Sequence, residues 1–380
     1  MRILLISPYH GGSHASWAQG LKRHSRHTIE LLTLPDRFWK WRMHGGAATL
    51  ARRFLADHQP PNVILATDML DLTTFLALTR AVTANVPAIL YMHENQLTYP
   101  LPAEPDAGPM RRQGGERDHH YAFVNFSSML AADRVVFNSA FHRDAWFEAL
   151  PRFLRHFPEH NELGSVDELR SRSCVLAVGI ETDDLEADTE VPDSSAPPLI
   201  IWNQRWEYDK NPALLLRALR EVADRGVGFR LAVCGQAFGK SPPGFEGIEE
   251  MFGDRLIHLG FADNEHYRLL LRQAALTVST ADHEFFGVAV LEAMAAGAFA
   301  VLPDRLSYPE LISGPEVGAE ARERCLYRSY EELVETVVWA LEHSHAAARI
   351  GKQLARNARR FDWCRVAPAY DTLFDTLSAV

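Results

Sequence analysis

The sequence predicts an α/β protein with two doubly wound domains. Short apolar and β-branched runs alternate with longer helical patterns along the whole chain. Several of these runs are apolar on consecutive residues, as in strands that helices cover on both faces of a parallel sheet. The alternation stops once, at a polar stretch rich in turn residues, and then restarts. Two domains of one architecture, joined by a linker, explain all three observations.

The strands follow from the apolar runs. In the first half we expect them over Arg2–Ser7, Ile29–Leu34, Val63–Ala66, Ala88–Met92, Arg134–Asn138 and Val175–Val178. In the second half we expect them over Leu199–Asn203, Arg230–Cys234, Leu256–Leu259, Leu276–Ser279 and Phe299–Leu302. The segments between them have helical spacing, for example Pro212–Arg225 and Val288–Ala296.

Domain boundaries follow from the polar stretch. Residues 187–198 combine proline, serine and acidic side chains and form the predicted linker. It separates an N-terminal domain over 1–186 from a C-terminal domain over 199–361. In the tail, 362–380, apolar residues recur at helical intervals and predict an amphipathic helix that could cross back to the N-terminal domain. Functional motifs are expected at strand ends, where open α/β sheets bind ligands.

Composition excludes several classes of protein. The chain has 380 residues, of which 47% are hydrophobic and 23% charged, so disorder, collagen-like repetition and a small disulfide-stapled fold are excluded. Its four cysteines lie far apart, which indicates free thiols in a reducing compartment. The apolar run at Ile3–Ile6 is too short for a signal-peptide core or a membrane span. These features predict a cytoplasmic protein without a membrane partner.

The segment 280–303 carries the most informative motif. It places Glu284 at the carboxyl end of a strand and Glu292 about two turns into the next helix, with Gly287 near the start of that helix. Backbone amides at a helix start attract phosphate, and a neighbouring carboxylate can accept hydrogen bonds from hydroxyls of a sugar or ribose. Each glutamate alone could be a solvated or capping residue, but the combination favours a functional site.

A pair of cations follows the first strand of the second domain. Arg205 and Lys210 lie five residues apart across a strand-to-helix turn, so both can reach one anion. Together they could neutralise charge that develops on a departing nucleotide diphosphate. The alternative is a pair of surface cations without a specific role.

Two motifs follow strands of the first domain. Gly11 and Gly12 permit a backbone turn close to a ligand, although a structural turn is the commoner role of such a pair. His93 ends another strand and could be a structural group. The polar residues Glu94, Asn95 and Gln96 come directly after it and favour a site.

The motif around Glu284 and Glu292 resembles the E-x7-E signature of the family 4 retaining glycosyltransferases, which have two Rossmann-like domains facing across a cleft, the GT-B architecture. The resemblance implies that Glu284 contacts hydroxyls of the donor sugar and that Glu292 holds the nucleotide ribose. It also implies that the backbone at 286–288 approaches the sugar and diphosphate. The residues of that stretch are Phe286, Gly287 and Val288.

Other motifs match the same family. Arg205 and Lys210 have the identity and spacing of its cation pair, which would stabilise the leaving diphosphate. Gly11 and Gly12 match its N-terminal glycine loop near the donor phosphate. His93 corresponds to the histidine that related enzymes direct at the donor sugar. No side chain stands out as a nucleophile, which fits a front-face mechanism with retention.

The N-terminal motifs resemble a narrower group, the tRNA-queuosine α-mannosyltransferases. They are Ser-Pro-Tyr-His-Gly-Gly-Ser-His from Ser7, Leu-Pro-Asp-Arg-Phe-Trp-Lys-Trp-Arg-Met-His-Gly-Gly-Ala from Leu34, His-Glu-Asn-Gln-Leu-Thr-Tyr-Pro from His93 and Phe-Asn-Ser-Ala-Phe-His from Phe137. The resemblance implies transfer of mannose from GDP-mannose to the cyclopentenediol of queuosine in the tRNA for aspartate. The implied acceptor residues include His14, Glu94, Asn95 and Gln96.

The charge is distributed unevenly between the halves. Lys+Arg and Asp+Glu number 19 and 17 over residues 1–180, but 20 and 32 over 181–380. The overall net charge of −10 therefore argues against nucleic acid only for the second half. Basic clusters of the first half are interleaved with aromatic residues that could stack on an exposed anticodon base. These aromatics are Phe38, Trp39, Trp41 and Tyr121.

The segment 100–117 is the candidate for a mobile acceptor loop beside His93, because it contains several prolines and glycines. Its basic residues, Arg111, Arg112 and Arg117, would contact tRNA phosphates.

No Asp-x-Asp pair occupies a suitable strand-end loop, and the cation pair can neutralise the charge that a metal would otherwise neutralise. We therefore expect neither a metal nor a cofactor. Two alternatives stay open: a family 4 enzyme with another nucleotide sugar and a lipid or saccharide acceptor, and a catalytically silent tRNA-binding protein. The sequence does not fix the oligomeric state.

Overall fold

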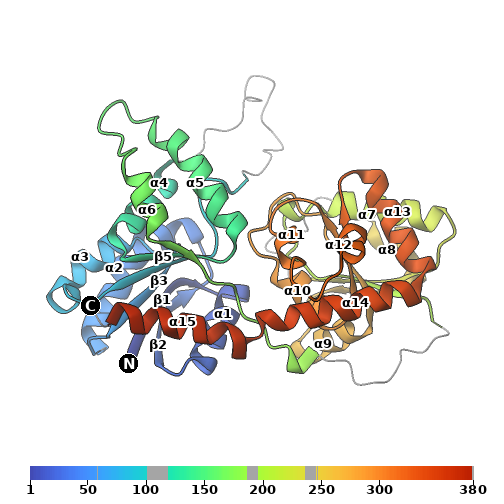
Figure 1. Cartoon of the computed structure of the whole chain (residues 1–380), viewed down its shortest axis with the longest axis horizontal. Helices are drawn as coiled ribbons and strands as arrows, with labels where there is room; N and C mark the ends of the chain where they lie inside the picture. Colours follow the sequence, from blue (N-terminus) through green and yellow to red (C-terminus); the bar gives the residue numbers. More distant parts are fainter. Residues whose placement is uncertain (58, 101–118, 186–195, 236–244, 246, 379–380) are drawn as a thin grey trace. The chain divides into compact units, whose positions relative to one another are not determined.

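The computed structural model describes residues 1–57, 59–100, 119–185, 196–235, 245 and 247–378. The chain divides into two compact units. Unit 1 comprises Met1–Gly179 with Trp363–Val380, and unit 2 comprises Ile180–Asp362 (Figure 1). The predicted linker 187–198 lies mostly outside the described residues, as do Arg111, Arg112 and Arg117.

Unit 1 is built on a parallel sheet, six-stranded over the described residues, with the order β2-β1-β3-β4-β5-β6. Its strands are β1 Arg2–His10, β2 Thr28–Pro35, β3 Val63–Thr67, β4 Ala88–Met92, β5 Arg134–Phe137 and β6 Ser173–Val175. Its helices are α1 Gly12–His24, α2 Trp39–Asp57, α3 Leu72–Thr83, α4 His119–Ala131, α5 Ala140–Leu154, α6 Ser165–Ser171 and α15 Trp363–Ser378. The strand order reverses between β1 and β3, which is where doubly wound sheets bind their ligands.

Unit 2 repeats the plan with the order β12-β11-β10-β7-β8-β9 over the described residues. Its strands are β7 Leu199–Trp202, β8 Arg230–Cys234, β9 Leu256–Gly260, β10 Ala274–Val278, β11 Phe299–Pro303 and β12 Leu326–Tyr327. Its helices are α7 Pro212–Asp224, α8 Ile248–Phe252, α9 Asn264–Gln273, α10 Val288–Ala295, α11 Tyr308–Leu311, α12 Ala319–Cys325, α13 Tyr330–Glu342 and α14 Ser344–Ala358. Here the order reverses between β7 and β10.

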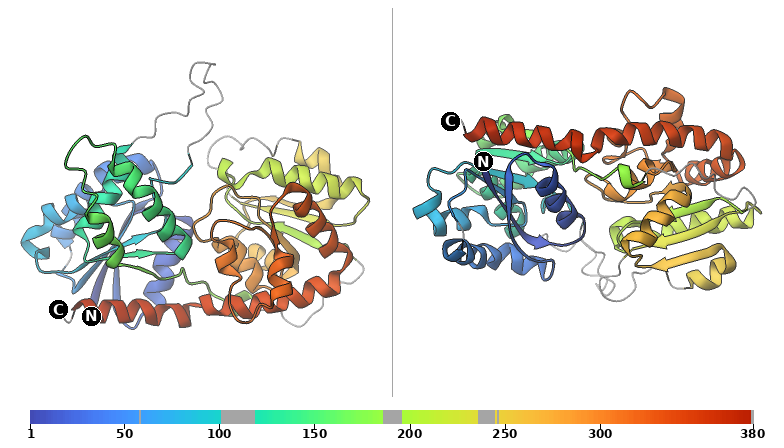
Figure 2. Two further views of the ribbon diagram at one scale, coloured as in Figure 1. Left: turned by 45° about the horizontal axis from the view of Figure 1, so that its top comes forward. Right: turned by 90° about the horizontal axis from the view of Figure 1, so that it is seen from below.

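Helices cover both faces of each sheet (Figures 1 and 2). The central strands β3, β4, β7 and β11 are buried along their whole length. This burial explains why their sequences are apolar on consecutive residues instead of alternating.

The C-terminal helix α15 packs in unit 1. Trp363, 2% exposed, sits where a side-chain carbon added at Gly20 of α1 or at Gly179 would overlap its ring. Tyr370, one per cent exposed, accepts a hydrogen bond from Trp17 Nε1 at 3.1 Å. Large buried aromatic residues therefore fix the helix on unit 1.

Two strand predictions need correction. The sixth strand is Ser173–Val175 instead of Val175–Val178, because β5 ends at Phe137 and offers no ladder partner further along. The carbonyl of Leu176 instead accepts hydrogen bonds from the hydroxyls of Tyr91 and Tyr370. The two-residue strand β12 was not predicted, since it is too short to leave a pattern.

Candidate active site

The carboxyl ends of β7 and β10 bring the two predicted motifs of unit 2 together. These strands are parallel neighbours in the sheet. The loop after β7 carries residues 203–211, and the loop after β10 carries 279–287. Arg205 and Lys210 thus lie at the same reversal of strand order as Glu284, although more than 70 residues separate them from Glu284 along the sequence.

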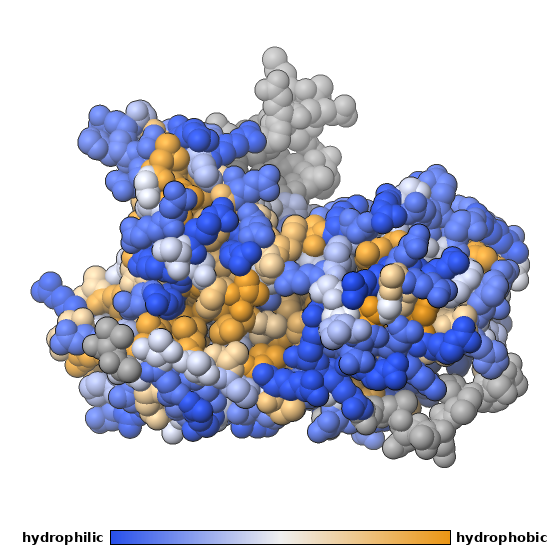
Figure 3. Space-filling model, in the orientation of Figure 1, coloured by the Kyte–Doolittle hydropathy of each residue, from blue (hydrophilic) through white to orange (hydrophobic). Residues whose placement is uncertain are grey.

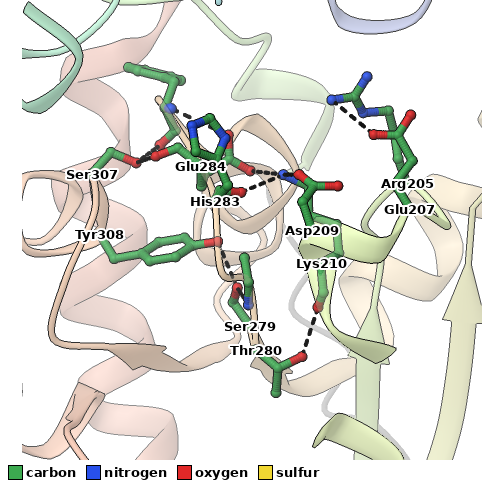
Figure 4. A network of polar contacts seen from close by, with 12 residues as sticks. Arg205, Glu207, Asp209, Lys210, Ser279, Thr280, His283, Glu284, Ser307 and Tyr308 are labelled. Carbon is green, nitrogen blue, oxygen red and sulfur yellow. Dashed lines mark hydrogen bonds and ion pairs between the residues drawn. The ribbon is translucent and has the colours of Figure 1, made fainter. Parts of the chain in front are cut away.

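Lys210 is the centre of a buried ion cluster (Figure 4). Its Nζ lies 3.1 Å from Asp209 Oδ2 and 3.2 Å from Glu284 Oε2, and it donates a hydrogen bond to the His283 carbonyl at 2.9 Å. The side chains of Lys210 and Asp209 are 6% and 0% exposed, and that of Glu284 is 21% exposed. Glu284 is therefore the member of the cluster that reaches solvent.

Backbone contacts hold the two loops against each other. The Thr280 hydroxyl donates to the Lys210 carbonyl at 3.0 Å, and the amide of Asp282 donates to the Asp209 carbonyl at 2.8 Å. Asn211, in the left-handed region with a φ of 49°, ends the short helical turn Tyr208–Lys210 and caps α7. This turn aims the Lys210 side chain into the unit.

Charge interactions set the ionisation of the cluster. Burial lowers the pKa of Lys210, but the carboxylates of Glu284 and Asp209 more than offset this and raise it above its ordinary value. Burial raises the pKa of Glu284, and Lys210 reverses the effect so that the carboxyl stays ionised. Burial and then Lys210 lower the pKa of His283 to about 4. At neutral pH the cluster holds charged Lys210 and Glu284 beside a neutral imidazole.

The start of α10 depends on Gly287. Its φ of 97° disfavours any residue with a side chain, and a carbon added there would lie 3.2 Å from Leu311 Cδ1. The Ser307 hydroxyl donates to the Phe286 carbonyl at 3.0 Å and fixes the turn from behind. Val288 is the first helical residue, so the backbone of 286–288 forms the helix start.

Glu292 lies on α10 within a second polar group. It accepts a hydrogen bond from the Tyr267 hydroxyl at 2.7 Å, and Asn203 Nδ2 donates to that hydroxyl at 2.8 Å. Burial raises the pKa of Glu292 to about 7, despite the opposing hydrogen bond from Tyr267. A carboxyl held near its midpoint at neutral pH is typical of a functional site.

Arg205 is more exposed than Lys210, but its charge still acts on the pKa values of Lys210 and Glu284. Its side chain is 42% exposed, and its Nη2 lies 3.5 Å from Glu207 Oε2 (Figure 4). The structure thus places the two predicted cations in different surroundings, one buried in an ion cluster and the other near solvent.

In unit 1 the residues after β1 and β4 meet. Gly11 caps α1, and Gly12 begins it with a φ of 49°. His14, on the first turn, packs on His93 with ring centroids 4.2 Å apart. Both histidines are buried, at 7% and 8% exposure. The sequence-distant glycine loop and His93 therefore form one group.

His93 is held by its backbone while its ring keeps an unused nitrogen. Its amide donates to Asp68 Oδ1 and its carbonyl accepts from Asn138 Nδ2, both at 2.9 Å. Within the described part of the chain, His93 Nε2 has no hydrogen-bond partner. Burial, with His14 and His142 nearby, lowers the pKa of His93 well below its ordinary value. The ring is therefore neutral at pH 7, and its Nε2 can donate a hydrogen bond to a ligand or accept one from it.

The three polar residues after His93 have different roles. Asn95 is fully buried, and its Oδ1 accepts from the amides of Leu97 and Thr98 at 3.1 and 2.7 Å. Glu94 and Gln96 are partly exposed. Asn95 therefore shapes the turn, whereas the side chains of Glu94 and Gln96 are accessible to solvent.

Several residues of these groups were missed at the level of sequence. Tyr267 and Asp68 contact predicted residues, yet neither belongs to a motif used in the prediction. Asp209 lies between Arg205 and Lys210 in the sequence but is not among the predicted site residues. No signal in the sequence marks Asp209 as buried, because a carboxylate next to a lysine can equally well lie in solvent. Burial raises the pKa of Asp68 well above its ordinary value, with Glu94 adding to the effect.

Across the described residues, no group of three or more His, Cys, Asp or Glu side chains is arranged to hold a metal ion. In the same part of the chain, no helix combines the length and apolar character needed to cross a membrane.

Solved structures share this fold. Sucrose-phosphate synthase from Thermosynechococcus elongatus superposes with a TM-score of 0.72 at 15% identity, over 100% of this chain and 99% of that one. The Anabaena HepE protein in complex with UDP and glucose gives 0.68 at 15% identity, over the whole of both chains. The second half, residues 186–358, matches the family model "Glycosyl transferases group 1". The fold and this match define a hexosyltransferase of the GT-B class.

The first half narrows the assignment. Residues 2–180 match the family model "tRNA-queuosine alpha-mannosyltransferase N-terminal". The Drosophila melanogaster tRNA-queuosine alpha-mannosyltransferase is 34% identical over 317 residues, which are 81% of each chain. The chain belongs to the tRNA-queuosine alpha-mannosyltransferase family.

Proposed function

We propose that this protein transfers mannose from GDP-mannose to a hydroxyl of the cyclopentenediol of queuosine in the tRNA for aspartate, with retention at the anomeric carbon. Membership of the family supports the donor and the acceptor. The observation that carries the chemistry is the buried Lys210–Glu284 pair at the strand-order reversal of unit 2.

Unit 2 is the proposed donor side. Lys210 and Arg205 would offset the charge of the diphosphate, together with the amides at Phe286, Gly287 and Val288 at the start of α10. Glu284 is ionised and partly exposed, so it can accept hydrogen bonds from hydroxyls of the mannose. Glu292 would hold the ribose.

Unit 1 is the proposed acceptor side. The neutral ring of His93 can bond a sugar hydroxyl through Nε2. Gly11 and Gly12 allow a ligand to approach the backbone, and His14 supports the His93 ring by stacking. Glu94 and Gln96 are the candidates for contact with the diol.

The reaction balances without a covalent enzyme intermediate. The bond between the anomeric carbon and the diphosphate oxygen breaks while a bond to the acceptor oxygen forms on the same face of the sugar. The acceptor proton passes to an oxygen of the leaving phosphate. Orientation and stabilisation of negative charge are then the tasks left to the protein.

We also propose that no metal takes part, since Lys210 and Arg205 can neutralise the leaving group. Transfer is expected to proceed at its full rate after dialysis against EDTA. Loss of activity in EDTA that Mn²⁺ or Mg²⁺ restores would contradict this proposal.

Two alternatives make different predictions. A family 4 enzyme with another acceptor would glycosylate a lipid or a saccharide, and a catalytically silent tRNA-binding protein would bind donor and tRNA without turnover. The presence together of Arg205, Lys210, Glu284 and Glu292 favours turnover over a silent protein. A tRNA acceptor makes the cytoplasm the expected place of action.

The test is a matrix of donors and acceptors. Purified protein is incubated with GDP-mannose, GDP-fucose, UDP-glucose or UDP-galactose, each with queuosine-containing tRNA, a polyprenyl phosphate or an oligosaccharide. We expect product only with GDP-mannose and queuosine tRNA. Product on the lipid or the saccharide, or none in any combination, would reject the proposal.

A further inference from the structure

We propose that Phe38 and Trp41 form a stacking surface for an unpaired base of the acceptor tRNA. This inference rests on the proposed function, because it takes a tRNA as the acceptor. Phe38 is 78% exposed and Trp41 is 63% exposed. Large aromatic side chains normally bury most of their surface, and among the described large hydrophobic residues none is more exposed than Phe38.

The backbone presents Phe38 at a cost. Its φ of 54° lies in the left-handed region, which is unfavourable for an aromatic residue. Hydrogen bonds on both sides hold the turn: the amide of Arg37 donates to the Pro35 carbonyl at 2.9 Å, and the amide of Arg42 donates to the Phe38 carbonyl at 3.1 Å. Core packing does not offset the strain, because the side chain lies in solvent.

Trp41 rests on a glycine. A side-chain carbon added at Gly45, one turn later on α2, would lie 2.9 Å from Cζ2 of the Trp41 ring. The ring therefore packs against the bare backbone at Gly45 and leaves most of its surface exposed. A flat aromatic ring supported on one side is suited to stack a base on the other.

Cations lie next to the two aromatic residues in the sequence. Arg37 and Lys40 are exposed, and Lys40 Nζ lies 5.6 Å from the centroid of Trp39. Aromatic and basic residues in alternation bind single-stranded nucleic acid, because every base has a face to stack and every phosphate a charge. The positive charge of Arg37 and Lys40 favours an RNA loop over a neutral protein as the partner of this surface.

The surface begins beside the candidate site of unit 1. His10, at the end of β1, pairs with Pro35, at the end of β2. A side-chain carbon added at Gly11 would overlap the side chain of Asp36, so the two loops are in direct contact. A base stacked on Phe38 or Trp41 would therefore belong to the same RNA loop as a nucleotide bound near His93.

The primary test removes both rings in the variant F38A/W41A. Stacking contributes about 1–3 kcal/mol per base, so we expect the KM for queuosine tRNA to rise roughly 10- to 100-fold. The dissociation constant for GDP-mannose should not change. The control is L55A, which removes an exposed apolar side chain, 51% exposed, from the other end of α2 and should behave as the wild type.

A second variant tests the surface without removing a ring. In G45A the added methyl group pushes the Trp41 ring away, whereas alanine is a better helix former than glycine. We expect weaker tRNA binding with an unchanged or higher Tm. A loss of tRNA binding in G45A then cannot be attributed to unfolding of the protein.

Normal tRNA binding by folded F38A/W41A and G45A, with an active wild type, would overturn this inference alone. The same holds if F38A/W41A changes the oligomeric state in sedimentation, because the rings would then face a second copy of the chain. If the wild type modifies no tRNA, the proposed function itself fails.

Discussion

Lys210 has a proposed role in the chemistry and a structural role in a buried ion cluster. Lys210 is 5% exposed and neutralises the buried carboxylate of Asp209. Removal of one partner leaves an uncompensated buried charge, which costs about 3–5 kcal/mol.

We therefore predict different outcomes for K210A and E284Q. K210A should lose turnover by several orders of magnitude and also about 3 kcal/mol of unfolding free energy. E284Q keeps an oxygen that accepts from Lys210, so it should lose more than about 100-fold in turnover with little change in stability. Urea unfolding and a transfer assay measure the two quantities. Near-normal turnover of E284Q would remove Glu284 from the mechanism.

Glu292 should make stability depend on pH. Its pKa of about 7 in the folded protein lies above the ordinary 4.5, so the folded state binds the extra proton. The loss of unfolding free energy that comes from burying ionised Glu292 is thus absent below about pH 4.5 and complete above about pH 7. E292Q should be more stable than the wild type at pH 8, by at most about 3 kcal/mol, and the difference should vanish near pH 4.5. Equal Tm values at pH 8 would contradict the shift.

At this scale the sequence predicts some residues and misses others for a physical reason. Glu284, Lys210 and His93 belong to recognisable motifs at strand ends. Asp209 lies in the same segment as Lys210, but a carboxylate next to a lysine gives no sign that both side chains point inward. That orientation comes from the short helical turn Tyr208–Lys210.

Among the elements, α15 packs in unit 1 because glycines on the segments that it contacts leave room for its tryptophan. Trp363 fits only because Gly20 and Gly179 lack side chains; a carbon at either position would approach the ring to 2.2 or 2.3 Å. The amphipathic spacing of the tail predicts the helix itself. It does not predict which surface receives it, because the receiving glycines are far away in sequence.

This packing predicts that G20A is destabilising. Alanine gains up to about 1 kcal/mol in helix α1, but overpacking against a buried tryptophan costs about 1–3 kcal/mol. We expect a net loss in urea unfolding. The control is G164A, where φ is −64° and no atom lies within 4 Å of the added carbon. A G20A protein as stable as G164A would contradict the packing.

Strand prediction succeeds where burial and pairing coincide. β3, β4, β7 and β11 are buried throughout and flanked by partners on both sides. It fails at two of the sheet edges, where β6 ends together with its neighbour β5 and β12 has two residues, whereas the edge strands β2 and β9 follow their apolar runs. An apolar run in the sequence indicates that a segment is buried. Where the strand ends depends on hydrogen bonding to the neighbouring strand, which the run does not indicate.

For the whole molecule, net charge is a poor guide to contact with RNA. The second half is acidic, yet residues 343–361 contain five cations and no carboxylate. Arg349, Lys352, Arg356 and Arg359 are exposed on α14 and its continuation, and the surface over α14 is hydrophilic in Figure 3. Neither half is therefore uniform in charge, and the surface has to be examined element by element.

The central claim is that this chain adds mannose to queuosine with retention. Wild-type protein and GDP-mannose are incubated with tRNA for aspartate that carries queuosine or, as a matched control, guanosine at the same position. The tRNA is digested and its nucleosides are analysed by mass spectrometry before and after α-mannosidase. We predict one added hexose on queuosine, removed by α-mannosidase, and none on the control. An unmodified queuosine, or a hexose that α-mannosidase leaves in place, would contradict the claim.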